Sequence, residues 1–160
     1  MGVFTPLAVR IGSLEFLPRF LPQITATDKA LQRVSRGHLS LLRLAGLPTI
    51  TITVPARSSG LPRTTPLLAV PRNGDWLIAG SNFGQPTRPL WVGNLEAAGA
   101  AEVRVGPTTT SMTARRLTGT DRDAAWEAMC ATWPNFSLYE ARTDRRIEVF
   151  ELVDDAAASS

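Results

Sequence analysis

The chain has a single cysteine, Cys130, and a single histidine, His38. One cysteine excludes an internal disulfide and a cysteine-ligated metal cluster, and one histidine excludes a metal site built from several histidines. We therefore expect no metal ion, and a reducing, cytoplasmic compartment is the natural setting. His38 is also the only imidazole base for a serine hydrolase, and the G-x-S-x-G motif of such enzymes does not occur.

Long apolar runs are also missing. The N-terminal stretch "MGVFTPLAVRIGSLEFLPRFLPQIT" is apolar, but Arg10, Glu15, Arg19 and three prolines interrupt it. It is therefore too broken to supply the roughly 18 consecutive apolar residues of a membrane span, and it lacks the features of a signal peptide. Two interpretations stay open: residues 1–25 cover the core or a substrate cavity, or they make a peripheral contact with a membrane surface.

Lysine is nearly absent, because Lys29 is the only one, and arginine supplies the other positive side chains in a net charge of +3. No run of basic residues indicates nucleic-acid binding. Neither a Walker loop nor a Rossmann glycine fingerprint occurs, and carboxylates are sparse. If the chain is an enzyme, we expect a bound cofactor to supply the reactive atom.

Short strands and tight turns dominate the rest of the chain. The clearest strand is "PTITITV", in which Ile50, Ile52 and Val54 alternate with threonines. Turns are predicted at Asn73-Gly74 and Gly106-Pro107. Further strands are predicted over 38–46, 65–72, 75–81, 102–105, 110–117 and 146–152, and helices over 28–36 and 121–133, the second with Ala124, Ala125, Met129 and Trp133 on its inner face.

This pattern predicts a mainly β fold with flanking helices, in which six to seven antiparallel strands close into a barrel. We divide the chain into an apolar and helical N-terminal segment over 1–37, one barrel domain over 38–153, and a disordered tail over 154–160. No sequence pattern sets the oligomeric state.

The first candidate site is the loop "ARSSGLPR", residues 56–63. Arg57, Ser58, Ser59 and Gly60 place a guanidinium, two hydroxyls and several backbone N–H groups in one turn, and Arg63 adds a second guanidinium. Such a turn can bind an anion, although an ordinary polar hairpin has the same composition.

Two further loops combine small polar and aromatic residues. The strand end Gly80-Ser81-Asn82 would let a flat ligand approach the backbone, and Asn94 is expected to cap the following helix. Trp133, Phe136 and Tyr139 recur at a spacing of three residues. That spacing is typical of helix packing, but Pro134-Asn135 interrupts the helix, so an aromatic lid is the alternative.

Four separated motifs, "ARSSGLPRTTPLL", "GDWLIAGSNFG", "PLWVGNLEA" and "TWPNFSLYEARTDRRIEVFEL", resemble the deazaflavin-dependent nitroreductase family. The resemblance covers residues 38–153, with the motifs in order. Members of this family are small split β-barrel oxidoreductases that use the deazaflavin coenzyme F420, so the resemblance implies an actinobacterial enzyme of that kind.

The resemblance also implies roles for particular residues. The turn from Arg57 to Gly60 would bind the coenzyme phosphate, although relatives often have lysine where this chain has Ser58. Trp133, Phe136 and Tyr139 would contact the acceptor substrate. The remaining residues implied at the coenzyme are Arg63, Thr65, Pro66, Ala79, Gly80, Ser81, Asn82, Trp91 and Asn94.

The expected reaction is hydride transfer from reduced F420 to an electron-poor small molecule, namely a quinone, an activated enone or a nitro compound. Tyr139 or Ser81 would donate a proton or stabilise the anion formed on the acceptor, and water is an equal candidate. Two alternatives stay open: an FMN enzyme on the same barrel, and a non-catalytic F420-binding protein.

Overall fold

The computed structural model describes residues 46–158 of the 160-residue chain. The segment 1–37, the helix predicted over 28–36 and nearly all of the strand predicted over 38–46 lie outside the described residues. The described elements are β1 (Thr49–Pro55), β2 (Pro62–Leu68), β3 (Val70–Arg72), β4 (Asp75–Ala79), the short turn η2 (Asn82–Gly84), α4 (Leu90–Ala98), β5 (Ala100–Val105), β6 (Thr108–Arg116), α5 (Gly119–Thr132), α6 (Asn135–Ala141), β7 (Val149–Asp154) and α7 (Asp155–Ala158).

Strand β1 has the predicted alternation. Ile50, Ile52 and Val54 are at most 2% exposed and face the inside of the sheet. The threonines between them point to the opposite face, because successive side chains of a strand alternate. Thr51 is buried on that face as well.

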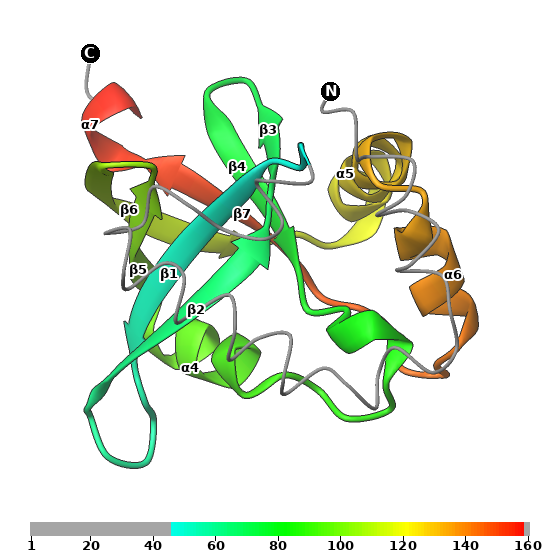
Figure 1. Cartoon of the computed structure of the whole chain (residues 1–160), viewed down its shortest axis with the longest axis horizontal. Coiled ribbons are helices and arrows are strands. Elements are labelled where there is room, and N and C mark those ends of the chain that lie inside the picture. Colours follow the sequence, from blue (N-terminus) through cyan, green and yellow to red (C-terminus); the bar gives the residue numbers. More distant parts are fainter. Residues whose placement is uncertain (1–45, 159–160) are drawn as a thin grey trace.

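The seven strands form one antiparallel sheet in the order β2-β1-β5-β6-β7-β4-β3. The single strand predicted over 65–72 is therefore two strands. The first, β2, ends at Leu68, and the second, β3, begins at Val70. These strands lie at opposite edges of the sheet, and only Ala69 separates them. Ala69 is fully buried, and its N–H donates to the carbonyl oxygen of Pro48 at 3.1 Å. Because the two edges meet at this residue, the sheet curls into a split barrel (Figure 1).

Both predicted turns are confirmed. Asn73 and Gly74 form a two-residue loop between β3 and β4 with φ angles of 53° and 88°, as a type I′ hairpin requires. Gly106, at φ 57°, reverses the chain between β5 and β6.

Apolar side chains form two clusters, one inside the curled sheet and one outside it. Helix α4 covers the inner cluster with Trp91, Val92 and Leu95. The outer cluster lies between the sheet and helices α5 and α6, which Figure 1 shows together on one side of the sheet. The fold class expected from the sequence is thus confirmed.

The structure differs from three local expectations. Ala124 was expected on the inner face of α5 but is exposed, and Trp126 is buried instead. Asn94 does not cap a helix, because α4 already begins at Leu90 after Pro89, whose fixed φ suits a helix start. Residues 155–158, assigned from the sequence to the tail, form the short helix α7.

No helix within residues 46–158 is long and apolar enough to cross a membrane.

Candidate functional site

The loop between β1 and β2 is a tight, exposed turn. The N–H of Gly60 donates to the carbonyl oxygen of Ala56 at 2.8 Å, and the N–H of Ala56 donates to that of Leu61 at 2.9 Å. Gly60 has a φ of +72°, where a side chain would be strained. The side chains from Arg57 to Gly60 are all exposed. The residues predicted to bind an anion are therefore presented together to solvent.

Helix α4 fixes this turn from one side. The N–H of Arg57 donates to Oδ1 of Asn94 at 3.1 Å. The Arg57 guanidinium lies against Gly93, since a Cβ on Gly93 would be 2.9 Å from its Cζ. Asn94 and Gly93 thus hold Arg57 from the helix, so Asn94 supports the turn rather than the helix end.

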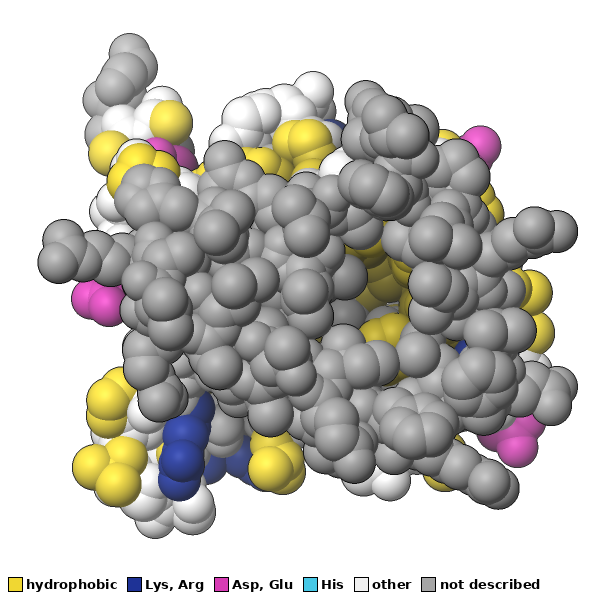
Figure 2. All heavy atoms as spheres, viewed as in Figure 1, with side chains coloured by type: hydrophobic (Ala, Val, Ile, Leu, Met, Phe, Trp, Pro, Cys, Tyr) yellow, Lys and Arg dark blue, Asp and Glu magenta, His cyan; other side chains and the backbone are white. Residues whose placement is uncertain are grey.

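Arg57 in the turn and Arg63 at the start of β2 have no ion-pair partner within residues 46–158. Both side chains are exposed. By contrast, Arg72, Arg88 and Arg145 each form ion pairs. Figure 2 shows Lys and Arg side chains gathered beside this turn, in the lower left. An anionic ligand would supply the missing counter-charge.

Thr65 and Pro66 lie on the edge strand β2 and are half-buried. Thr65 pairs with Ile52 and therefore shares its face of the sheet, whereas Pro66 pairs with Thr51. A proline is tolerated there because an edge strand leaves one row of N–H positions unpaired. Strand β2 thus continues directly from the turn that was predicted to bind an anion.

The end of β4 passes closely beneath α4. A Cβ on Gly80 would lie 2.7 Å from Cγ2 of Val92, so only glycine fits, and the Gly80 N–H donates to the carbonyl oxygen of Glu148 at 2.9 Å. Ala79 and Ser81 on either side are half-exposed. The predicted glycine is therefore needed for packing between backbone and helix.

The following turn, η2, is left-handed. Asn82, Phe83 and Gly84 have φ angles of 44°, 54° and 77°. Such angles are uncommon for residues with a side chain, and they concentrate at functional sites. Asn82 closes the loop by donating from Nδ2 to the carbonyl oxygen of Thr87 at 2.9 Å.

Arg145, which the sequence analysis did not single out, holds this loop. Its Nη2 donates to the carbonyl oxygens of Gly80 at 2.7 Å and Ser81 at 3.0 Å, and its Nε donates to that of Gln85 at 3.2 Å. Its Nη1 also pairs with Glu148 at 3.3 Å. The side chain is only 17% exposed. Its position inside the motif "TWPNFSLYEARTDRRIEVFEL" was the only available signal.

Trp91 lies in the inner cluster rather than on the surface. It is 8% exposed, and its ring centroid lies 6.1 Å from that of Phe150. Trp91 therefore fixes α4 over the barrel. It thereby also fixes Gly93 and Asn94 of this helix, which contact Arg57.

The three predicted acceptor-binding aromatics belong to the outer cluster. Trp133, Phe136 and Tyr139 are each 6% exposed or less. Nε1 of Trp133 donates to the hydroxyl oxygen of Tyr139 at 3.4 Å. Burial raises the pKa of the Tyr139 phenol above its usual value, although its hydrogen bonds with Trp133 and Asn135 act in the opposite direction. The phenol therefore stays protonated at neutral pH.

Tyr139 nevertheless lies next to the left-handed turn. Its ring centroid is 5.4 Å from that of Phe83, and a Cβ on Gly84 would be 2.6 Å from its backbone oxygen. The structure thus brings together Tyr139 and the loop from Gly80 to Gly84. The turn at Arg57 joins the other side of that loop through α4, since α4 contacts both Arg57 and Gly80.

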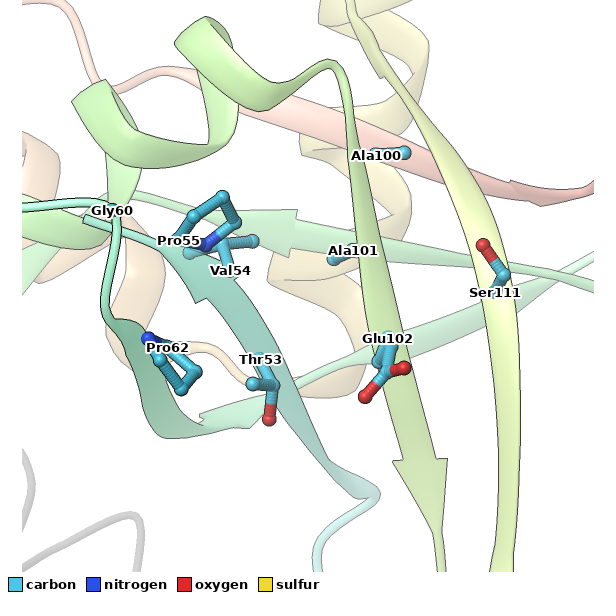
Figure 3. Close-up of a pocket in the computed structure, with 9 residues that line it drawn as sticks. All are labelled: Thr53, Val54, Pro55, Gly60, Pro62, Ala100, Ala101, Glu102 and Ser111. Atoms are coloured by element: carbon cyan, nitrogen blue, oxygen red, sulfur yellow. The ribbon is translucent and has the colours of Figure 1, made fainter. Parts of the chain in front are cut away.

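A separate cleft of about 380 Å³ opens on the outer face of β1, β5 and β6 (Figure 3). Thr53, Glu102 and Ser111 occupy neighbouring positions across these strands. Of the residues predicted at the coenzyme, only Gly60 lines this cleft. A carboxylate at its centre does not suit a phosphate, so we assign the coenzyme elsewhere.

A curled antiparallel sheet with a basic turn packed on a helix, and a glycine-rich strand end beside it, is a split-barrel fold, which the solved structure of an F420-H2 dependent reductase shares. A family model described as F420H(2)-dependent quinone reductase matches residues 26–154. The chain belongs to this family, and it is an oxidoreductase that uses coenzyme F420. The resemblance stated from the sequence is confirmed.

Individual relatives agree with this assignment. The F420H(2)-dependent quinone reductase Rv1261c of Mycobacterium tuberculosis is 31% identical over 134 residues, which cover 81% of this chain and 89% of the relative. The structure of an F420-H2 dependent reductase, FDR-A, has a TM-score of 0.61 at 32% identity and covers 66% of this chain and 93% of that one. A structure described as a domain-swapped dimer has a TM-score of 0.64 at 30% identity, over 79% and 93% of the two chains.

The residues present fit an acidic coenzyme. F420 carries a phosphate and a glutamate tail, and the turn offers two exposed guanidinium groups with no carboxylate partner in residues 46–158. Gly60 is exposed and keeps the backbone of the turn accessible at a φ where a side chain would be strained.

Proposed function

We propose that this protein transfers a hydride from reduced F420 to a small electron-poor acceptor, with quinones as the preferred class and enones and nitro compounds as secondary ones. The observation that best supports this site is the way in which helix α4 holds Arg57. Asn94 holds its backbone and Gly93 accommodates its guanidinium, yet the charge remains exposed. An arginine that is held in place, and that pairs with no carboxylate in the described part of the chain, is suited to a ligand phosphate.

The chain's own residues would bind and orient the coenzyme. Arg57 would hold the phosphate, with Ser58, Ser59 and the Gly60 backbone completing the turn, and Arg63 would add a second charge. Thr65, Pro66 and the strand end from Ala79 to Asn82 would lie along the ring and its ribityl chain. When bound, reduced F420 supplies the hydride, so the protein itself needs no redox-active side chain.

Reduction of a quinone to a hydroquinone needs a proton in addition to the hydride. We propose Tyr139 as the donor, because its ring lies against Phe83 in the loop after β4 and its phenol carries a proton at neutral pH. Burial raises the pKa of this phenol, so it would donate as a weaker acid than an exposed tyrosine. Its burial means that the acceptor would have to approach through the outer cluster. Ser81 and water are the alternatives, and Ser81 is half-exposed.

We also propose that the protein works in the reducing cytoplasm, and that residues 1–25 either cover the acceptor or touch a membrane surface. Both proposals rest on the sequence of that segment, which is apolar but interrupted by charges and prolines.

The function is tested by anaerobic turnover with the full chain. Reduced F420 or reduced FMN is offered as donor, together with a soluble quinone, a cyclic enone or a nitroaromatic, and the return of oxidised donor absorbance is followed. We expect protein-dependent oxidation of reduced F420, fastest with the quinone. Turnover with reduced FMN alone would identify an FMN enzyme. Tight F420 binding without turnover of any acceptor would identify a coenzyme-binding protein.

A further inference from the structure

The loop after β4 contains three backbone N–H groups that have no acceptor among residues 46–158. Ser81 has right-handed angles (φ −70°, ψ −36°), and Asn82, which follows it, has a φ of +44°. Successive N–H groups in a right-handed and then left-handed pair point into one concavity, which binds anions. No group in residues 46–158 accepts a hydrogen bond from the N–H groups of Ser81, Asn82 or Phe83.

Arg145 bonds to the other ends of the same peptide groups. The carbonyl of Gly80 belongs to the peptide that carries the Ser81 N–H, and the carbonyl of Ser81 belongs to the peptide that carries the Asn82 N–H. Nη2 of Arg145 donates to both oxygens, at 2.7 and 3.0 Å. A cation at the oxygen of a peptide polarises it, so that its N–H becomes a stronger donor.

Arg145 cannot itself serve as the anion ligand in this arrangement. Its Nε donates to the carbonyl oxygen of Gln85, its Nη1 pairs with Glu148, and its side chain is only 17% exposed. One guanidinium therefore fixes both ends of a loop whose left-handed residues are otherwise unfavourable.

We propose that the N–H groups of Ser81, Asn82 and Phe83 form an anion-binding nest for a carbonyl oxygen that carries partial negative charge in the hydride-transfer reaction, and that Arg145 is the positioning residue that holds and polarises it. This inference rests on the proposed function. The oxygen belongs either to the acceptor or to the coenzyme ring. An acceptor carbonyl gains negative charge when it receives the hydride, and preorganised donors stabilise charge that develops in this way. A ring carbonyl is more negative in the reduced coenzyme and loses that charge as the hydride leaves, so there the nest would favour binding of the reduced form.

The test compares Arg145→Met and Arg145→Lys with Arg72→Met, which removes another part-buried, ion-paired arginine at a distant strand. Dissociation constants are measured by fluorescence titration for oxidised and reduced F420, alongside thermal unfolding and kcat and KM for a quinone. For a ring oxygen, we expect Arg145→Met to weaken binding of the reduced form about tenfold more than that of the oxidised form. By two-electron linkage, this equals a shift of about 30 mV in the potential of the bound coenzyme.

For an acceptor oxygen, both coenzyme affinities would stay similar while kcat falls about tenfold at unchanged KM. Arg145→Lys should recover part of either effect because it keeps the charge. Equal changes in all these quantities for Arg145→Met and Arg72→Met would overturn the proposal. Failure of the unaltered protein to bind F420 in either form would instead contradict the proposed function.

A second pair of variants covers the case in which Arg145→Met does not fold. The φ of Ser81 is −70°, which proline adopts, so Ser81→Pro removes one N–H of the nest while keeping the backbone angle. Ser81→Ala removes the hydroxyl but keeps that N–H. We expect Ser81→Pro to show the selective loss relative to Ser81→Ala, and identical behaviour of the two variants would contradict the nest.

Discussion

Replacing Gly93 with alanine should separate coenzyme binding from stability. A Cβ at this position would lie 2.9 Å from Cζ, 3.1 Å from Nη2 and 3.2 Å from Nε of Arg57. These separations are shorter than van der Waals contact. The guanidinium is the end of a flexible side chain, so we expect it to move away while helix α4 stays in place.

The two consequences have opposite signs. Alanine is favoured over glycine in a helix by roughly 1 kcal/mol, so the free energy of unfolding should stay level or rise. Charge-assisted hydrogen bonds contribute about 1.5–3 kcal/mol, and we take the lower end because Arg57 is exposed. A loss of about 1.4 kcal/mol in binding free energy corresponds to a tenfold larger dissociation constant.

The assay is fluorescence titration with F420, paired with thermal unfolding, for Gly93→Ala, Arg57→Ala and the double variant. Arg57→Ala should weaken binding by about 1.5–3 kcal/mol with little change in stability. Once Arg57 is absent, Gly93→Ala should have no further effect, because both changes act on one interaction. A tenfold effect of Gly93→Ala that persists without Arg57, or wild-type affinity of Gly93→Ala, would refute the reasoning.

Tyr139→Phe keeps the buried ring and removes only the hydroxyl, so kcat should fall roughly ten- to a hundredfold, towards the lower end of general-acid effects, at nearly unchanged F420 affinity; unchanged kcat for every acceptor would leave Ser81 or water as the donor. Deleting residues 1–25 should spare F420 affinity but slow turnover of bulky apolar acceptors, and loss of F420 binding in a folded protein would place the segment at the coenzyme instead. Burial alone would raise the pKa of Glu151, but its bonds to Arg115 and Arg72 hold the pKa below the usual value of a glutamate. The carboxylate therefore stabilises the fold above the pKa that it has in the unfolded chain, and this stabilisation is lost as the pH falls through its lower folded pKa. Glu151→Gln should flatten the acid limb of the unfolding free energy, and an unchanged limb would contradict this.

Local patterns were sufficient for much of the barrel. Ile50, Ile52 and Val54 could be assigned to one face because strand periodicity is a local property, and Asn73-Gly74 could be assigned to a turn because the turn itself requires positive φ. Ala69 could not be identified as a break. Residues 66–71 form a continuous apolar run inside the predicted strand, and the division arises only because its two halves pair at opposite edges of the sheet.

The site shows the same boundary between local and long-range information. Arg57 to Gly60 and Gly80 to Asn82 were identified from composition and from a family resemblance. The role of Arg145 could not be predicted from the sequence, because its partners Gly80 and Ser81 lie more than sixty positions earlier in the chain. The sequence alone does not indicate which groups a single arginine among many contacts. The spacing of Trp133, Phe136 and Tyr139 left packing and acceptor binding open, and their burial does not by itself decide between the two roles.

The central claim, that the turn at Arg57 is the phosphate seat of an F420 site, is tested most directly by equilibrium titration with two ligands. One is F420, and the other is the same deazaflavin ring and ribityl chain without the phosphate and its tail. We predict that the unaltered protein binds F420 more tightly by at least tenfold, and that Arg57→Ala loses most of that preference while its affinity for the phosphate-free ligand stays the same. Equal affinity of the unaltered protein for both ligands, or a preference that survives in Arg57→Ala, would contradict the account.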